Sequence, residues 1–137
     1  MKTKHLFRIG PACILALLLA ACEDDSGGGG ADIAPENDAL LALVKGDCIS
    51  GEGTDETPGY PAYLGPMAPH MRIEVRGGGA ARAGDGAAQT PGDLDAVNPG
   101  YLLILYGKND VINGVDTEAA AGAIQAIVDA ALANGTR

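Results

Sequence analysis

Two short, uninterrupted runs of apolar residues constrain the fold of this chain more than any other feature. They are residues 39–44 (ALLALV) and residues 101–106 (YLLILY). A strand that is apolar on both sides needs cover on both faces, which is typical of parallel sheets flanked by helices. Residues 72–75 form a weaker third candidate strand. Because these runs alternate with helical or loop segments, we predict an α/β fold with a parallel sheet.

The segments between and after these strands predict helices. Residues 117–134 form the clearest one, with Asp116 as its N-cap and Gly135 as its C-terminal stop. Its apolar side chains recur at helical spacing, so one face should pack on the sheet. These side chains belong to Ala120, Ile124, Ile127, Val128, Ala131 and Leu132. Short helices are also expected within residues 58–70 and 80–97, where prolines and glycines leave the limits open.

The amino terminus has the features of a secretory signal. A basic start precedes an apolar run over residues 11–21, which is too short to span a bilayer as a finished helix. The run ends in Leu-Ala-Ala-Cys at residues 19–22, which resembles the lipobox of bacterial lipoproteins. The resemblance implies that Cys22 is lipidated and becomes the first mature residue, anchored to a membrane of the bacterial cell envelope. An ordinary signal peptide that ends by chance in a cysteine is the alternative.

Composition divides the chain into three segments. Residues 1–21 are the predicted lipoprotein signal, and residues 22–37 combine the lipidated cysteine with a flexible, acidic and glycine-rich tether. Residues 38–137 are the predicted folded domain. The whole chain carries a formal charge of −9, and such an acidic surface repels phosphate, so we expect no nucleic-acid partner. Loss of the signal and lipidation of Cys22 leave Cys48 as the last free thiol, which excludes an intrachain disulfide.

Two motifs lie where predicted strands end. Gly-Asp-Cys at residues 46–48 follows the first strand, and Gly-Lys-Asn-Asp at residues 107–110 follows the third. With the strand, motif and capped helix in the same order over residues 101–116, the chain resembles the SGNH/GDSL hydrolase family. The resemblance implies a three-layer, flavodoxin-like fold with a parallel sheet, truncated after the third strand and its helix. Ligands of open parallel sheets bind at the carboxyl ends of strands, which is where both motifs lie.

The resemblance also implies site residues. Cys48 stands at the nucleophile position, where the family has serine, and Ser50 would point elsewhere. The expected donors to an oxyanion are the N–H of Cys48, the N–H of Gly79 and the side-chain amide of Asn109. Gly79 is one of three consecutive glycines, so a plain flexible turn is an equal interpretation. For Cys48 the alternatives are a packed thiol without a function and a redox thiol in an oxidising envelope.

The implied activity is hydrolysis of an ester or other acyl bond through an acyl-enzyme intermediate. The substrate would be an ester or an acylated small molecule or carbohydrate, and neither a cofactor nor a metal is expected. The family's Asp-x-x-His block has no counterpart before Arg137, and His70 in a proline-rich loop does not match it. A general base typically contributes about 10²–10⁴ in rate. The sequence therefore predicts either an impaired hydrolase or a catalytically inactive lipoprotein or binding module.

Overall fold

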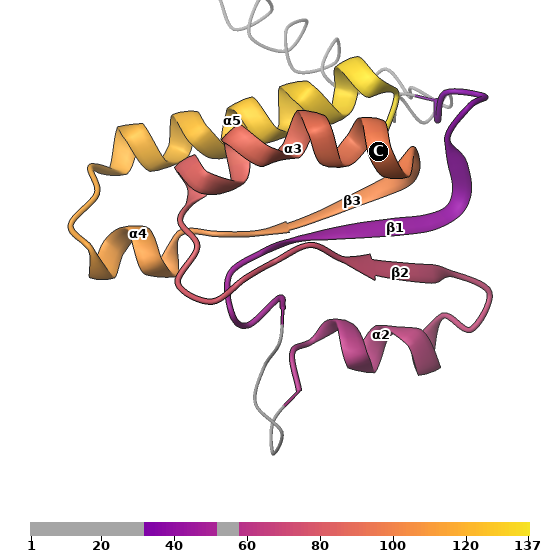
Figure 1. The fold of residues 1–137 in the computed structure, drawn as a ribbon, viewed down its shortest axis with the longest axis horizontal. Helices are drawn as coiled ribbons and strands as arrows, with labels where there is room; N and C mark the ends of the chain where they lie inside the picture. Colours follow the sequence, from indigo (N-terminus) through magenta and orange to yellow (C-terminus); the bar gives the residue numbers. More distant parts are fainter. Residues whose placement is uncertain (1–31, 52–57) are drawn as a thin grey trace, which may run out of the picture.

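The computed structural model describes residues 32–51 and 58–137, and in this part of the chain a parallel sheet of three strands carries helices on both faces (Figure 1). The strands are β1 (Asp38–Gly46), β2 (Arg72–Val75) and β3 (Pro99–Leu105). Their order in the sheet is β2-β1-β3, and both pairings are parallel. The predicted α/β class is confirmed.

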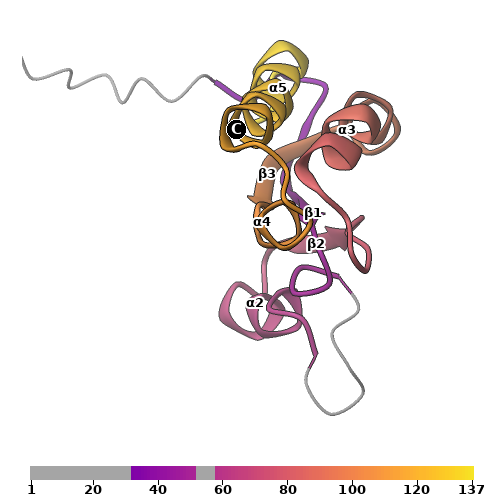
Figure 2. The same cartoon turned by 90° about the vertical axis from the view of Figure 1, so that its left-hand side faces the viewer.

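The helices form the two outer layers. Their bounds are Pro61–Met67 for α2, Ala83–Val97 for α3, Lys108–Ile112 for α4 and Thr117–Asn134 for α5. Helices α3 and α5 lie side by side on one face of the sheet, and α2 lies on the other face (Figures 1 and 2). The short helix α4 follows β3 at the carboxyl end of the sheet (Figure 1). It is absent from the sequence-based prediction because five residues are too few to show helical periodicity.

Helix α5 has the bounds and the caps that the sequence predicts. The Asp116 carboxylate accepts hydrogen bonds from the N–H groups of Glu118 and Ala119 at 3.0 and 3.1 Å, which satisfies two donors of the first turn. Gly135 ends the helix with a φ of 75°, a left-handed conformation that glycine adopts at little cost.

The core lies between β1 and the two long helices. Leu43 of β1, Leu94 of α3 and Ala131 of α5 are buried against one another, with Leu102 of β3 beside them. Ala131 therefore takes the predicted core position on α5. Leu132 does not, because it is 53% exposed. Consecutive residues point about 100° apart around a helix, so a contact centred on Ala131 turns Leu132 away from the core.

The folded part includes the last residues of the predicted tether. Ala34 donates its N–H to the oxygen of Gly135 at 2.9 Å, and the Asn37 amide donates to the oxygen of Asn134 at 3.0 Å. These bonds fix the segment before β1 against the end of α5. The predicted signal and Cys22 lie outside the described residues. In the described part of the chain, no helix combines the length and the apolar character needed to cross a membrane.

Candidate functional site

The segment after β1 forms a tight turn that presents Cys48. Asp47 is buried, and its carboxylate accepts a hydrogen bond from the N–H of Ile49 at 2.9 Å. Its backbone oxygen accepts from the N–H groups of Ser50 and Gly51, both at 3.0 Å. These bonds fold the chain back on itself directly after the strand. Cys48 stands at the start of this turn, is partly exposed and forms no disulfide.

Ser50 is excluded as a surface nucleophile, in agreement with the sequence-based expectation. Its side chain is fully buried, and its hydroxyl has no hydrogen-bond partner among the described residues. The hydroxyl lies against Gly46, where an added Cβ would come within 2.1 Å of the Ser50 Oγ. Burial raises the pKa of the neighbouring Tyr60 phenol. Between Ser50 and Cys48, the two candidate nucleophiles of this turn, Cys48 is therefore the one that solvent can reach.

The segment after β3 places Asn109 and Asp110 in the interior. Gly107 turns the chain with a φ of 114°, and α4 then buries Asn109 and Asp110. The Asn109 Nδ2 donates to the backbone oxygen of Ala81 at 3.0 Å, and the Asp110 carboxylate accepts from the N–H of Ala83 at 3.0 and 3.2 Å. Both bonds hold the loop between β2 and α3. An amide has two N–H donors, so Asn109 keeps one for another acceptor.

The glycine loop after β2 comes very close to the end of β1. The N–H of Gly78 donates to the oxygen of Gly46 at 3.2 Å. A Cβ on Gly77 would come within 2.8 Å of that same oxygen, so only glycine fits there. The N–H of Gly79 has no acceptor among the described residues. The three loops that carry Cys48, Gly79 and Asn109 thus meet at the carboxyl end of the sheet.

The histidine of the described chain lies elsewhere. His70 is exposed in the turn before β2. Since β1 and β2 are parallel, the start of β2 and the end of β1 are at opposite edges of the sheet. His70 is therefore at the amino edge, whereas Cys48 is at the carboxyl edge. Within residues 32–51 and 58–137, no three His, Cys, Asp or Glu side chains are grouped in a way that could hold a metal ion.

An ionic network around a buried lysine lies beside these loops, and it is absent from the sequence-based prediction. Lys45 of β1 is fully buried and pairs with Asp93 of α3. Arg76 at the end of β2 joins the same carboxylate at 2.9 Å and also bonds Glu74 at 2.8 Å. Burial by itself would raise the pKa of Asp93, but its bonds with Lys45 and Arg76 lower it below the ordinary value of 3.8. Lys45 directly follows the apolar run 39–44. This position, next to a buried strand, is the sequence feature that could have indicated a buried charge.

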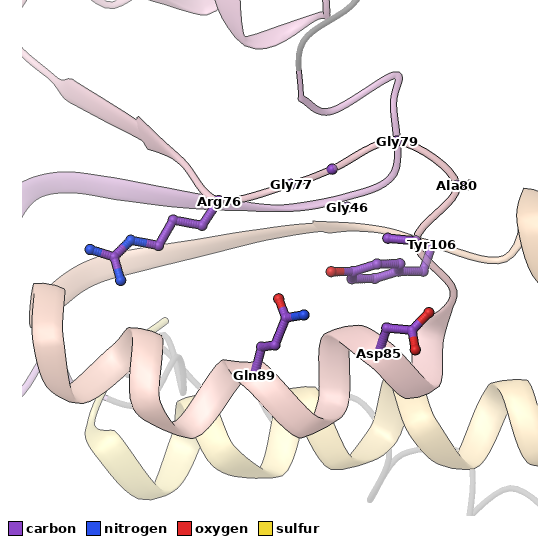
Figure 3. A pocket seen from close by; sticks show the side chains of 10 residues that line it. Gly46, Arg76, Gly77, Gly79, Ala80, Asp85, Gln89 and Tyr106 are labelled. Carbon is purple, nitrogen blue, oxygen red and sulfur yellow. The ribbon is translucent and has the colours of Figure 1, made fainter.

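A pocket of about 360 Å³ opens between the glycine loop and α3 (Figure 3). Gln89 and Asp85 point from the helix toward the loop and toward Tyr106, which follows β3 (Figure 3). The Tyr106 ring rests on Gly86, where an added Cβ would come within 2.4 Å of the ring. Gly79 lines this pocket.

Compared by sequence, the chain matches no protein-family model and no curated protein. Compared by structure, it is similar to AlinE4, an esterase of the SGNH-hydrolase family, with 22% identity, a TM-score of 0.63 and coverage of 71% of this chain and 55% of that one. It is also similar to TesA, with 24% identity, a TM-score of 0.66 and coverage of 71% and 57%. For the psychrotrophic esterase EstA from Pseudoalteromonas sp., the identity is 20%, the TM-score 0.61 and the coverage 71% and 56%.

These comparisons define the class of the fold. The chain has the α/β fold of SGNH hydrolases over a little more than half of the length of those structures. The fold that the resemblance implied is therefore confirmed. The roles assigned to Cys48, Gly79 and Asn109 remain predictions.

Proposed function

We propose that this chain belongs to a lipid-anchored ester hydrolase of the bacterial cell envelope, with Cys48 in the nucleophile position. The observation that carries the proposal is the meeting of three loops at the carboxyl end of a sheet with the SGNH hydrolase fold. One loop presents a partly exposed thiol. The other two carry Gly79 and Asn109, each with an N–H that has no acceptor in the described part of the chain.

The proposed chemistry is acyl transfer in two steps. The Cys48 thiolate attacks the carbonyl carbon of the ester, so that a C–S bond forms and negative charge develops on the carbonyl oxygen. Donors from Gly79 and Asn109 would stabilise that charge because they are fixed before the reaction begins. The C–O bond then breaks, the alcohol leaves with a proton, and water hydrolyses the thioester to release the acid and the thiol.

The first step needs a base to accept the thiol proton. His70 does not serve, because it lies at the amino edge of the sheet. The base is thus unassigned among the described residues. Even without one, a cysteine is a few per cent thiolate at neutral pH, so slow turnover at Cys48 is expected.

Hydrolysis of p-nitrophenyl acetate by the purified full chain tests this proposal. We expect a rate above the buffer background that disappears in Cys48→Ala. It should also fall to background in Cys48→Ser, because a serine hydroxyl without a base is not ionised at neutral pH, although this change restores the Gly-Asp-Ser of the family motif. Tyr63→Phe changes an exposed side chain on α2 and controls for handling and folding. Equal rates for the wild type and Cys48→Ala would contradict catalysis by Cys48 and support the non-catalytic binding module.

The anchor is tested separately, because its residues lie outside the described part of the chain. In a bacterial host that processes lipoproteins, the wild-type chain should incorporate labelled fatty acid and sediment with membranes. Cys22→Ala should do neither, whereas Cys13→Ala, within the predicted signal, should behave like the wild type. Fatty-acid incorporation that survives Cys22→Ala would contradict the proposed anchor.

A further inference from the structure

The pocket between the glycine loop and α3 is lined by groups that suit a particular kind of ligand. Its walls are the backbone of residues 77–81, the side chains of Asp85 and Gln89 from α3, Tyr106 after β3, and Arg76. Cys48 and Asn109 are not among the lining residues. A chain unable to cleave an ester could still bind a ligand here, so the inference goes beyond the proposed function.

The charges around the pocket are already paired within the protein. Arg76 is held by Glu74 and Asp93. Asp85 accepts the N–H of Arg82 at 3.0 Å and lies 3.5 Å from its guanidinium. An ionic ligand would have to compete with these pairs, and an anion would also meet the field of an acidic chain. The electrostatics therefore favour a neutral ligand.

Several hydrogen-bonding groups in the lining have no partner in the described part of the chain. The Tyr106 hydroxyl makes no hydrogen bond there. Burial, and to a lesser extent the nearby Asp93, raises the pKa of this phenol. Gln89 accepts from Lys45 through Oε1 at 3.4 Å, which leaves its NH₂ group open. The N–H groups of Gly77 and Gly79 have no acceptor among the described residues either.

We infer that this pocket binds a neutral, polyhydroxylated small molecule. A hydroxyl group both donates and accepts, so it can satisfy the amide and backbone donors and also bond the Asp85 carboxylate. Pockets for small molecules span about 300–1,000 Å³, and this one, at about 360 Å³, fits a ligand of monosaccharide size.

The test is a titration of the ¹⁵N-labelled full chain, followed by amide NMR, in zwitterionic detergent that carries no sugar headgroup. The probes are methyl α-D-glucopyranoside and two charged analogues, glucose 6-phosphate and glucosamine. We expect the neutral glucoside to shift the amide signals of Gly77, Gly79 and the Gln89 side chain in a saturable way. The charged analogues should bind more weakly. Absence of saturable shifts with the glucoside, or tighter binding of either charged analogue, would overturn the inference.

Two variants remove single donors while keeping the local packing. Tyr106→Phe keeps the ring on Gly86, and Gln89→Glu keeps an oxygen for Lys45 but loses the NH₂ group. Each should weaken glucoside binding by about 3- to 10-fold, as expected for one neutral hydrogen bond. The matched controls are Tyr63→Phe on α2 and Gln125→Glu on α5, both at exposed positions. Equal weakening by a control and by its matched pocket variant would contradict this site.

Discussion

The side-chain amide of Asn109 donates to the backbone oxygen of Ala81 at 3.0 Å, and this bond ties the segment after β3 to the loop after β2. The next residue, Asp110, strengthens the tie by accepting the N–H of Ala83. Asn109 is 8% exposed and Asp110 is 2% exposed, so the bond of Asp110 is buried and that of Asn109 is partly buried. The loop that carries Gly79 is thereby held by residues that follow a different strand.

Asn109→Ala should destabilise the chain. The substitution removes a partly buried hydrogen bond to the Ala81 oxygen, and the loss of such a bond typically lowers the free energy of unfolding by about 0.5–1.5 kcal/mol. Urea denaturation monitored by circular dichroism measures the change. The control is Gln125→Ala, because the Gln125 amide bonds only the exposed Asp129, and its effect should stay within about 0.5 kcal/mol. An Asn109→Ala chain as stable as the wild type would show that this bond does not hold the loop.

Asp93→Ala should lower the free energy of unfolding by more than a substitution that breaks an exposed ion pair. The substitution leaves Lys45, which is fully buried, with only the weak contact to Gln89. Removal of one member of a buried pair typically costs about 3–5 kcal/mol. Arg72→Ala, which breaks the exposed pair with Asp38, should cost about 0–1 kcal/mol.

A second substitution checks the cause of that loss. If the buried charge is responsible, Lys45→Met in the Asp93→Ala background should restore part of the stability, because no unpaired ammonium group remains. Urea unfolding of both single variants and of the double variant gives the interaction free energy between Lys45 and Asp93. A double variant that is less stable than Asp93→Ala would assign the loss to packing instead.

The chain should become less stable at acidic pH because the Asp93 carboxylate is protonated there. Bonds with Lys45 and Arg76 lower the pKa of Asp93 below 3.8, although burial opposes them. A depressed pKa in the folded state stabilises the chain above the unfolded value, and this contribution is lost as the pH falls through the folded pKa. Unfolding midpoints from about pH 7 down to about pH 3 should therefore drop below about pH 4. In Asp93→Asn the drop should be smaller, and an identical profile would exclude this group as the cause.

The sequence predicts the elements with strong periodicity. The bounds of α5 follow from its apolar spacing, Asp116 and Gly135, and β2 has the limits 72–75 that the sequence indicates. The position of Cys48 and Asn109 at one edge of the sheet follows from parallel topology alone. These features depend on local pattern and chain order.

The network of Lys45 and the bonds of Asn109 could not be predicted in the same way. Lys45 and Asp93 are 48 residues apart in the sequence, so their pairing depends on where α3 crosses β1. The apolar run ends at Val44, and a lysine after it suggests the end of the strand. The strand instead continues to Gly46, and it turns Lys45 toward α3.

The last prediction concerns the contact between Gly86 and Tyr106, which shapes the pocket. A Cβ at residue 86 would come within 2.4 Å of the Tyr106 ring, so Gly86→Ala must displace the ring and should cost about 1–3 kcal/mol. Gly92 lies in the same helix with nothing within 4 Å of its added Cβ, so Gly92→Ala should stabilise the chain by about 0.5–1 kcal/mol through helix propensity. Urea unfolding of the two variants tests the pair. Opposite signs are expected because the two sites share a helix and differ in the space beside them, and stabilisation by both would show that the ring does not rest on Gly86.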